Sequence, residues 1–238
     1  MSGWAIAAST CGGTGVGPGV RSKRFAAIAG MRLPPRPYDG AVEALLAFAA
    51  ALLALRFAGE LLGRARERRS QALLAWSASL FAYAVASGAL AWGAAAGWSD
   101  AAFRVYNLAG GLLTAPLLGT GSLLIAGKRW AAPVGLAYAG LAVGIALAMP
   151  LTAHFAGTAI PAAQDHLDFF PARFVAIVAN SLGTLAVVVV AIRSYRRRPL
   201  GNALILLGTG IAAAGSAVAG LGVAATGAPI PRLRPAPG

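Results

Sequence analysis

Few side chains in this sequence could bind or transform a ligand, and most of them fall near one end of long apolar stretches. Arg104 and Asn107 lie in the first turns of the third stretch, and Asn180 lies about two turns into the fifth. A charge near the centre of a bilayer costs about 2.5–3.5 kcal/mol, so polar residues in such stretches are hypotheses for a site. The candidate ligand-binding residues are Glu43, Arg104, Tyr106, Asn107, Asn180 and Ser181.

Two arrangements would satisfy these residues. They could form one polar cluster open to the outer side, with Glu43 and Arg104 as an ion pair. Alternatively, a neighbouring helix could satisfy each one singly, or the longer side chains could reach the interface. The position near the membrane boundary favours the second arrangement. Arg56 and Glu60 are four residues apart near the opposite boundary, which predicts a local ion pair.

The sequence gives little support for a metal site, a bound cofactor or a catalytic site. The loop between the fourth and fifth stretches holds weak candidate metal ligands, whose spacing matches no recurrent zinc motif: His154, Asp165, His166 and Asp168. A solvated loop is the favoured interpretation. No histidine or lysine lies inside an apolar stretch, so haem between helices and a retinal Schiff base are excluded. HExxH, Walker-type and GxSxG motifs are absent, and we therefore predict neither a cofactor nor an enzyme.

Composition decides the class of protein that must position these residues. The 238-residue chain is 58% hydrophobic and 11% charged, whereas soluble domains carry about 25% charged residues. The lone Cys11 cannot pair within the chain. These values exclude a soluble enzyme, a disordered chain and a disulfide scaffold. They predict a multipass membrane protein.

The predicted fold is all-α, a polytopic bundle of six membrane-spanning helices. A helix pairs its own backbone groups within the hydrocarbon, and the period-2 alternation of a membrane barrel is missing. The six apolar stretches are residues 41–62, 72–93, 103–126, 131–149, 174–192 and 203–224. Residues 1–40 form a disordered N-terminal tail, 41–224 the transmembrane domain and 225–238 a Pro-rich tail. Translation could begin at Met31, in which case residues 1–30 are not made natively.

Basic residues predict the orientation of the bundle. The connections after the first, third and fifth stretches hold ten of the twenty Lys and Arg residues. The positive-inside rule places these connections in the cytoplasm and both termini outside. Basic residues in the N-terminal tail count against this orientation. Anionic lipid is the expected partner, and no nucleic-acid module is present. The residues expected to contact lipid headgroups are Arg64, Arg66, Arg68, Arg69, Arg196, Arg197 and Arg198.

Small residues recur every four positions on the fourth and sixth stretches. They are Gly140 and Gly144 on the fourth and Gly208, Ala212, Ser216 and Gly220 on the sixth. Such faces allow two helices to approach closely in lipid. They predict packing within the bundle or, as the alternative, a homodimer, and packing within the bundle is favoured.

The sequence FRVYNLAGG at 103–111, followed by PLLGTG at 116–121, resembles the Arg-x-Tyr-Tyr-Leu-x-Gly helix of uncharacterised multipass proteins of high-GC actinobacteria. NSLGT at 180–184 and the Arg-rich turn before Gly201 and Asn202 are similar to the same family, over about residues 31–224. Asn107 replaces the second tyrosine. The family is distantly reminiscent of membrane sensor regions of bacterial histidine kinases. The resemblance implies a helical bundle in a bacterial inner membrane and no established activity.

Two classes of function remain. In the first, the bundle is a non-enzymatic sensor-like or accessory membrane protein with a small polar site near the outer face. In the second, it is a small-solute transporter or channel. Transporters interrupt helices near the midplane, and Gly110, Gly111 and Pro116 could provide one such interruption. The other half of the chain has no matching interruption, which favours the first class.

Overall fold

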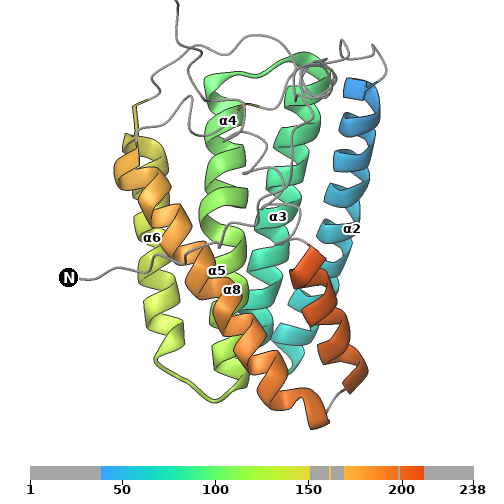
Figure 1. Ribbon diagram of the computed structural model, residues 1–238, viewed down its shortest axis with the longest axis vertical. Helices are drawn as coiled ribbons and strands as arrows, with labels where there is room; N and C mark the ends of the chain where they lie inside the picture. The colour runs from blue at the N-terminus through green and yellow to red at the C-terminus, as the bar shows by residue number, and fades with distance from the viewer. Residues whose placement is uncertain (1–38, 151–160, 162–168, 198, 212–238) are drawn as a thin grey trace, which may run out of the picture. The chain divides into compact units, whose positions relative to one another are not determined.

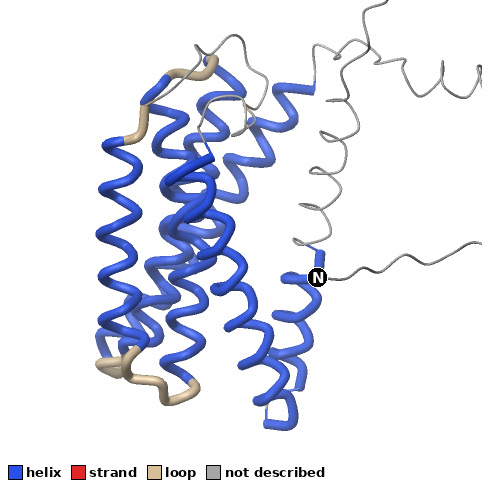
Figure 2. Tube along the Cα trace, turned by 60° about the vertical axis from the view of Figure 1, so that its left-hand side comes forward, coloured by secondary structure: helices blue, strands red, loops and turns tan. Residues whose placement is uncertain are grey.

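The computed structural model describes residues 39–150, 161, 169–197 and 199–211, which form helices and short turns without a strand (Figure 1, Figure 2). Five of these helices are long and apolar enough to cross a membrane. The prediction of an all-helical chain with several such helices is therefore confirmed. Several predictions lie outside the described residues: the N-terminal tail, the Pro-rich C-terminal tail, the alternative start at Met31, and residues His154, Asp165, His166, Asp168 and Arg198.

The first two spans form a helical hairpin. Helix α2 (Asp39–Glu67) begins two residues before the predicted stretch and ends five residues after it, and α3 (Gln71–Ala96) packs along it. Alanines at residues 47, 54, 58 and 65 are the buried residues of α2, a seam that lets α3 come close. Across this seam the Ser77 hydroxyl donates to the Ala58 carbonyl at 2.7 Å.

The third span is divided into three parts, and two of the three residues that could provide an interruption, Gly110 and Gly111, lie in the middle part. Helix α4 (Asp100–Tyr106) is followed by a π-helical segment, η1 (Asn107–Leu113), and then by α5 (Thr114–Ile125). The Ser99 side chain caps the first part, accepting from the Ala102 N–H at 3.2 Å. Gly110 and Gly111 lie inside η1, where glycine weakens the α-helical register. Pro116 lies inside α5 and causes no break of its own.

In the described residues, three further helices follow the third span. They are α6 (Ala131–Ala148), α8 (Phe174–Ser194) and the shorter helix Pro199–Ile211. The five-residue segment η2 (Phe169–Arg173) leads into α8, and η3 (Tyr195–Arg197) follows it. The predicted sixth stretch begins within Pro199–Ile211, but its residues 212–224 lie outside the described residues.

The third span lies at the centre of the packing. Its parts contact α3, α6 and α8, whereas α2 packs against α3. Phe103 and Leu112 are almost fully buried against Ala142 and Ile145 of α6. Two glycines bring α5 and α8 together, because a Cβ built on Gly119 would lie 2.6 Å from the Gly183 Cα.

Successive helices run in opposite directions, so the connections fall at two ends (Figure 1). The turns after α2, α5 and α8 lie at the same end. This end carries Arg64, Arg66, Arg68, Arg69 and Arg196, whose side chains are all exposed. The predicted grouping of the basic connections at one end is therefore present in the fold.

Candidate functional site

Side chains of two other helices donate to carbonyl groups of the π-helical segment in the third span. The Asn180 Nδ2 of α8 donates to the Gly111 carbonyl at 2.7 Å. The Tyr138 hydroxyl of α6 donates to the next carbonyl, that of Leu112, at 2.8 Å. Two different helices therefore supply donors to adjacent peptide groups of η1.

Thr114 and Ser79 complete this set of contacts. The Ala109 carbonyl accepts from the Thr114 backbone N–H, a bond across five residues, and from the Thr114 Oγ1 at 2.8 Å. The Ser79 hydroxyl of α3 donates to the Thr114 carbonyl at 2.7 Å. A π-helix changes the usual pairing of backbone groups, and hydrocarbon provides no water to replace lost partners. Side chains on α3, α5, α6 and α8 together satisfy this backbone.

Asn107 and Asn180 meet at Gly111. The Asn107 side chain is buried, with 9% of the residue exposed. A Cβ built on Gly111 would lie 3.0 Å from the Asn107 Oδ1, and Asn180 binds the Gly111 carbonyl. Each amide retains one buried atom without a hydrogen-bond partner, the Nδ2 of Asn107 and the Oδ1 of Asn180. These two atoms give the site one open donor and one open acceptor.

Arg104 donates a hydrogen bond to the C-terminal end of another helix. Its Nη1 donates to the Ala146 carbonyl at 2.8 Å, in the last turn of α6. Carbonyl groups in the last turn of a helix lack intrahelical partners, and a cation there also interacts favourably with the negative end of the helix dipole. The guanidinium group thus satisfies the end of a neighbouring span, as the second arrangement predicted.

The remaining predicted site residues do not join this group. Glu43 is exposed on α2, and within the described residues no ion pair links it to Arg104, so the pair that the first, less favoured arrangement allowed is not formed. Ser181 is exposed on α8. Tyr106 packs edge-on against Trp98, with ring centroids 5.5 Å apart. The site therefore contains Asn107 and Asn180, with Arg104 one turn away on the third span.

The local pair at the other end is confirmed. The Arg56 Nε donates to the Glu60 Oε1 at 3.3 Å, and both side chains are well exposed. Their positions four residues apart on α2 account for the contact.

Sequence reasoning missed Ser79 and Tyr138 as parts of the site. Both are polar residues inside apolar stretches, a signal that also singled out Asn107 and Asn180. A hydroxyl group does not indicate which carbonyl it will reach, because that depends on how distant helices pack. Tyr83, another polar residue of α3, is instead exposed at 45%.

The small-residue faces are not used between the described helices. Ideal Cβ atoms at Gly140, Gly144 and Gly208 meet no other atom within 4 Å. The interpretation that these three glycines pack within the bundle is therefore wrong for the described part of the chain. Ala212, Ser216 and Gly220 lie outside it. Close glycine packing occurs instead between Gly119 and Gly183.

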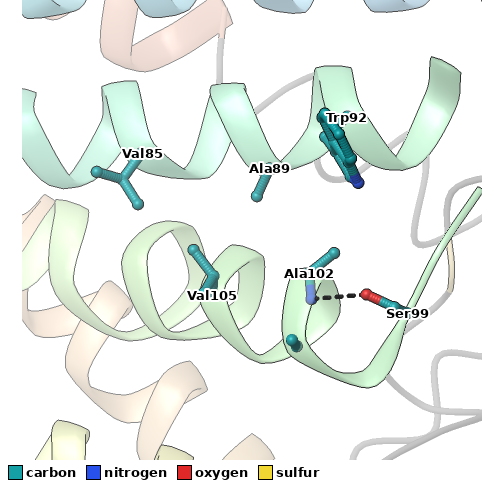
Figure 3. A pocket seen from close by; sticks show the side chains of 7 residues that line it. Val85, Ala89, Trp92, Ser99, Ala102 and Val105 are labelled. Atoms are coloured by element: carbon teal, nitrogen blue, oxygen red, sulfur yellow. Dashed lines mark hydrogen bonds between the residues drawn. The ribbon is translucent and has the colours of Figure 1, made fainter. Parts of the chain in front are cut away.

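An apolar groove of about 330 Å³ lies between α3 and α4 (Figure 3). Val85, Ala89 and Trp92 form one side, and the residues of α4 and its Ser99 cap face them across the groove. Apart from Ser99, its lining offers apolar side chains. Within residues 39–150, 161, 169–197 and 199–211, no group of three His, Cys, Asp or Glu residues could hold a metal ion.

Comparison of the chain with known protein families, curated proteins and solved structures finds no match. The geometry around η1 and the apolar character of the five long helices are the features that bear on function.

Proposed function

We propose that this chain is a six-span inner-membrane protein of the sensor-like or accessory class, without enzymatic activity, that binds a small polar ligand near its outer face. The sixth span would extend the helix Pro199–Ile211 through the rest of the predicted stretch 203–224. The basic ends would face the cytoplasm and contact anionic lipid headgroups, as the positive-inside rule expects.

The observation that carries this proposal is the meeting of Asn107 and Asn180 at Gly111, with one unpartnered buried atom on each amide. Buried polar atoms usually have partners, so an unpartnered buried donor on one of these amides and an unpartnered buried acceptor on the other favour a bound molecule. The site lies on a π-helical segment, a feature that often marks functional positions in helices. Its residues come from distant parts of the chain, so a ligand there could bias the packing of α8 against the third span.

Native mass spectrometry of the protein extracted in a mild detergent tests ligand binding. We expect the wild type to carry a small molecule and Asn107→Leu to lose it, because leucine fills similar space without a donor. Asn202→Leu is the matched control, since the Asn202 amide binds the Ser194 hydroxyl at 3.1 Å at the end of α8. A wild type that carries no mass beyond detergent and lipid contradicts the proposal.

A transporter is the second candidate, and the interrupted third span favours it. Transporters bind substrates where helices are discontinuous, usually in two related halves. The other described spans, α2, α3, α6 and α8, each run as one α-helix. The single interruption therefore supports a binding site more than an alternating pathway. Uptake of a solute into liposomes that is lost in Asn107→Leu would reverse this preference.

A further inference from the structure

Helix α2 carries its ion pair on the side that faces away from α3. Ala54 and Ala58 are buried in the seam between α2 and α3, and Arg56 lies two residues from each of them. Two residues turn an α-helix by about 200°, so Arg56 lies on the opposite side of α2. The Arg56 and Glu60 side chains remain 76% and 46% exposed although they contact each other. The pair therefore lies on the outer surface of the helix.

The same pair lies deep in the span. Arg56 comes two residues after Ala54, the middle residue of the span Ala41–Glu67. Arg64, at the basic end of the bundle, follows Arg56 by eight residues, or about 12 Å of helix. Charged side chains are costly in hydrocarbon, and a lipid phosphate that Arg56 attracted would be repelled by Glu60. Depth and the presence of both charges favour a protein surface as the neighbour of this face.

Two glycines beside the pair leave room for another helix. Gly59 and Gly63 are exposed, and within the described part of the chain Cβ atoms built on them meet no other atom within 4 Å. They follow Arg56 by three and by seven residues, so all three residues share one face of α2. Glycines four residues apart permit close approach of two helices in lipid. The face thus combines two opposite charges with a place where a second backbone can come near.

We propose that two copies of this chain associate through this face of α2, with Arg56 of each copy beside Glu60 of the other. Copies inserted in the same direction form a parallel pair, in which equal residues lie at the same depth. Arg56 of one copy then lies one turn, about 6 Å along the axis, from Glu60 of the second copy. One face supplies both charges, so a second copy complements it. This face differs from the small-residue faces of the fourth and sixth stretches.

Energy transfer between copies in liposomes tests the association. Cys11 is the one cysteine of the chain, so each copy takes one donor or one acceptor dye. We expect energy transfer for the wild type and its loss in Gly59→Leu, because the leucine side chain holds the two helices apart. Gly144→Leu is the matched control on α6, where the Cβ position is equally open, and should retain the transfer. A wild type without energy transfer, or a Gly59→Leu variant that retains it, overturns the inference.

Charge reversal separates contacts between copies from the pair within one chain. The Arg56→Glu copy carries two carboxylates on this face and the Glu60→Arg copy two guanidinium groups, so each variant repels its own kind. We expect neither variant to show energy transfer alone and a mixture of the two to regain it. A mixture of folded variants that shows no energy transfer overturns the inference. If a charge-reversed chain does not fold, Gly59→Leu and Gly144→Leu decide the question.

The readout must be association in a bilayer. An exposed ion pair adds little to the stability of a single chain, so these charges should have little effect on unfolding in micelles. Energy transfer that is lost in Arg56→Glu and regained in the mixture therefore reports a contact between copies.

Discussion

At the scale of single residues, the polar side chains of the spans divide into those that satisfy backbone and those that retain open atoms. Arg104 and Tyr138 belong to the first group, because each donates to a carbonyl of another helix. Asn107 belongs to the second, because it has one buried atom without a partner, and Asn180 belongs to both, because it also donates to the Gly111 carbonyl. The residue types alone did not separate these roles. Arg104 was one of the predicted ligand-binding residues, yet it donates to a carbonyl group in the last turn of α6.

Arg104→Met should therefore act on stability. We expect a loss of about 1.5–3 kcal/mol in the free energy of unfolding, the usual range for a hydrogen bond to a charged group. Reversible unfolding in mixed micelles measures this loss. Arg56→Met is the matched control, and should change stability by less than about 1 kcal/mol because its ion pair with Glu60 is exposed. Equal effects of the two substitutions would contradict the assigned role of Arg104.

Tyr138→Phe removes one donor without changing the shape of the side chain. The Leu112 carbonyl then loses its hydroxyl partner, and we expect a loss of about 0.6–1.7 kcal/mol, as for other hydrogen bonds between membrane helices. Tyr83→Phe makes the same chemical change at an exposed position and should leave the unfolding free energy nearly unchanged. Equal unfolding free energies for Tyr138→Phe and Tyr83→Phe would contradict the role of the Tyr138 hydroxyl.

At the scale of elements, the π-helical segment and the glycine contact decide how the third span packs. The sequence indicated a possible interruption at Gly110 and Gly111, but the π-helical form and the contact between Gly119 and Gly183 depend on partners far along the chain and were not predicted. Apolar length and composition predicted that residues 103–126 cross the membrane. Length and composition could not show that the helix is π-helical at η1, because the carbonyl groups of this segment accept hydrogen bonds from Tyr138 on α6 and Asn180 on α8.

Glycine substitutions test this packing directly. Gly183→Ala should cost about 1–3 kcal/mol, the usual range for overpacking, because the new methyl group would meet the Ala115 carbonyl and Pro116 of α5. Gly144→Ala should be neutral or stabilising, since nothing lies near its Cβ position and alanine favours the helix more than glycine. Thermal unfolding in detergent ranks the two variants. A Gly144→Ala variant that is the less stable of the two would show that α6 uses its open face.

At the scale of the whole molecule, composition was sufficient to predict a helical membrane protein, and five long apolar helices support that class. The order of the helices also followed from the sequence, because short basic connections alternate with apolar stretches. What the sequence could not supply was the lateral arrangement. The placement of the third span between α3, α6 and α8, and the exposure of Glu43, follow from side-chain shape across the bundle.

The orientation can be measured by cysteine labelling from each side of the membrane. In a Cys11→Ser background, the variants Arg66→Cys, Lys128→Cys and Arg196→Cys should react with a membrane-impermeant reagent only when it reaches the cytoplasm. Asp100→Cys, at the first residue of α4, should react from the outside. The fold places the first three at one end, so labelling of Arg66→Cys and Arg196→Cys from different sides would contradict both the orientation and the helix order.

The hydrogen bonds of η1 have a consequence for synthesis of the chain. The third span emerges from the ribosome before its partners, because Tyr138 follows Leu112 by 26 residues and Asn180 follows Gly111 by 69. Until those residues arrive, two peptide carbonyls lack the donors that the finished fold gives them. We therefore expect the nascent third span to stay beside the translocon, shielded from acyl chains, until α8 has been translated.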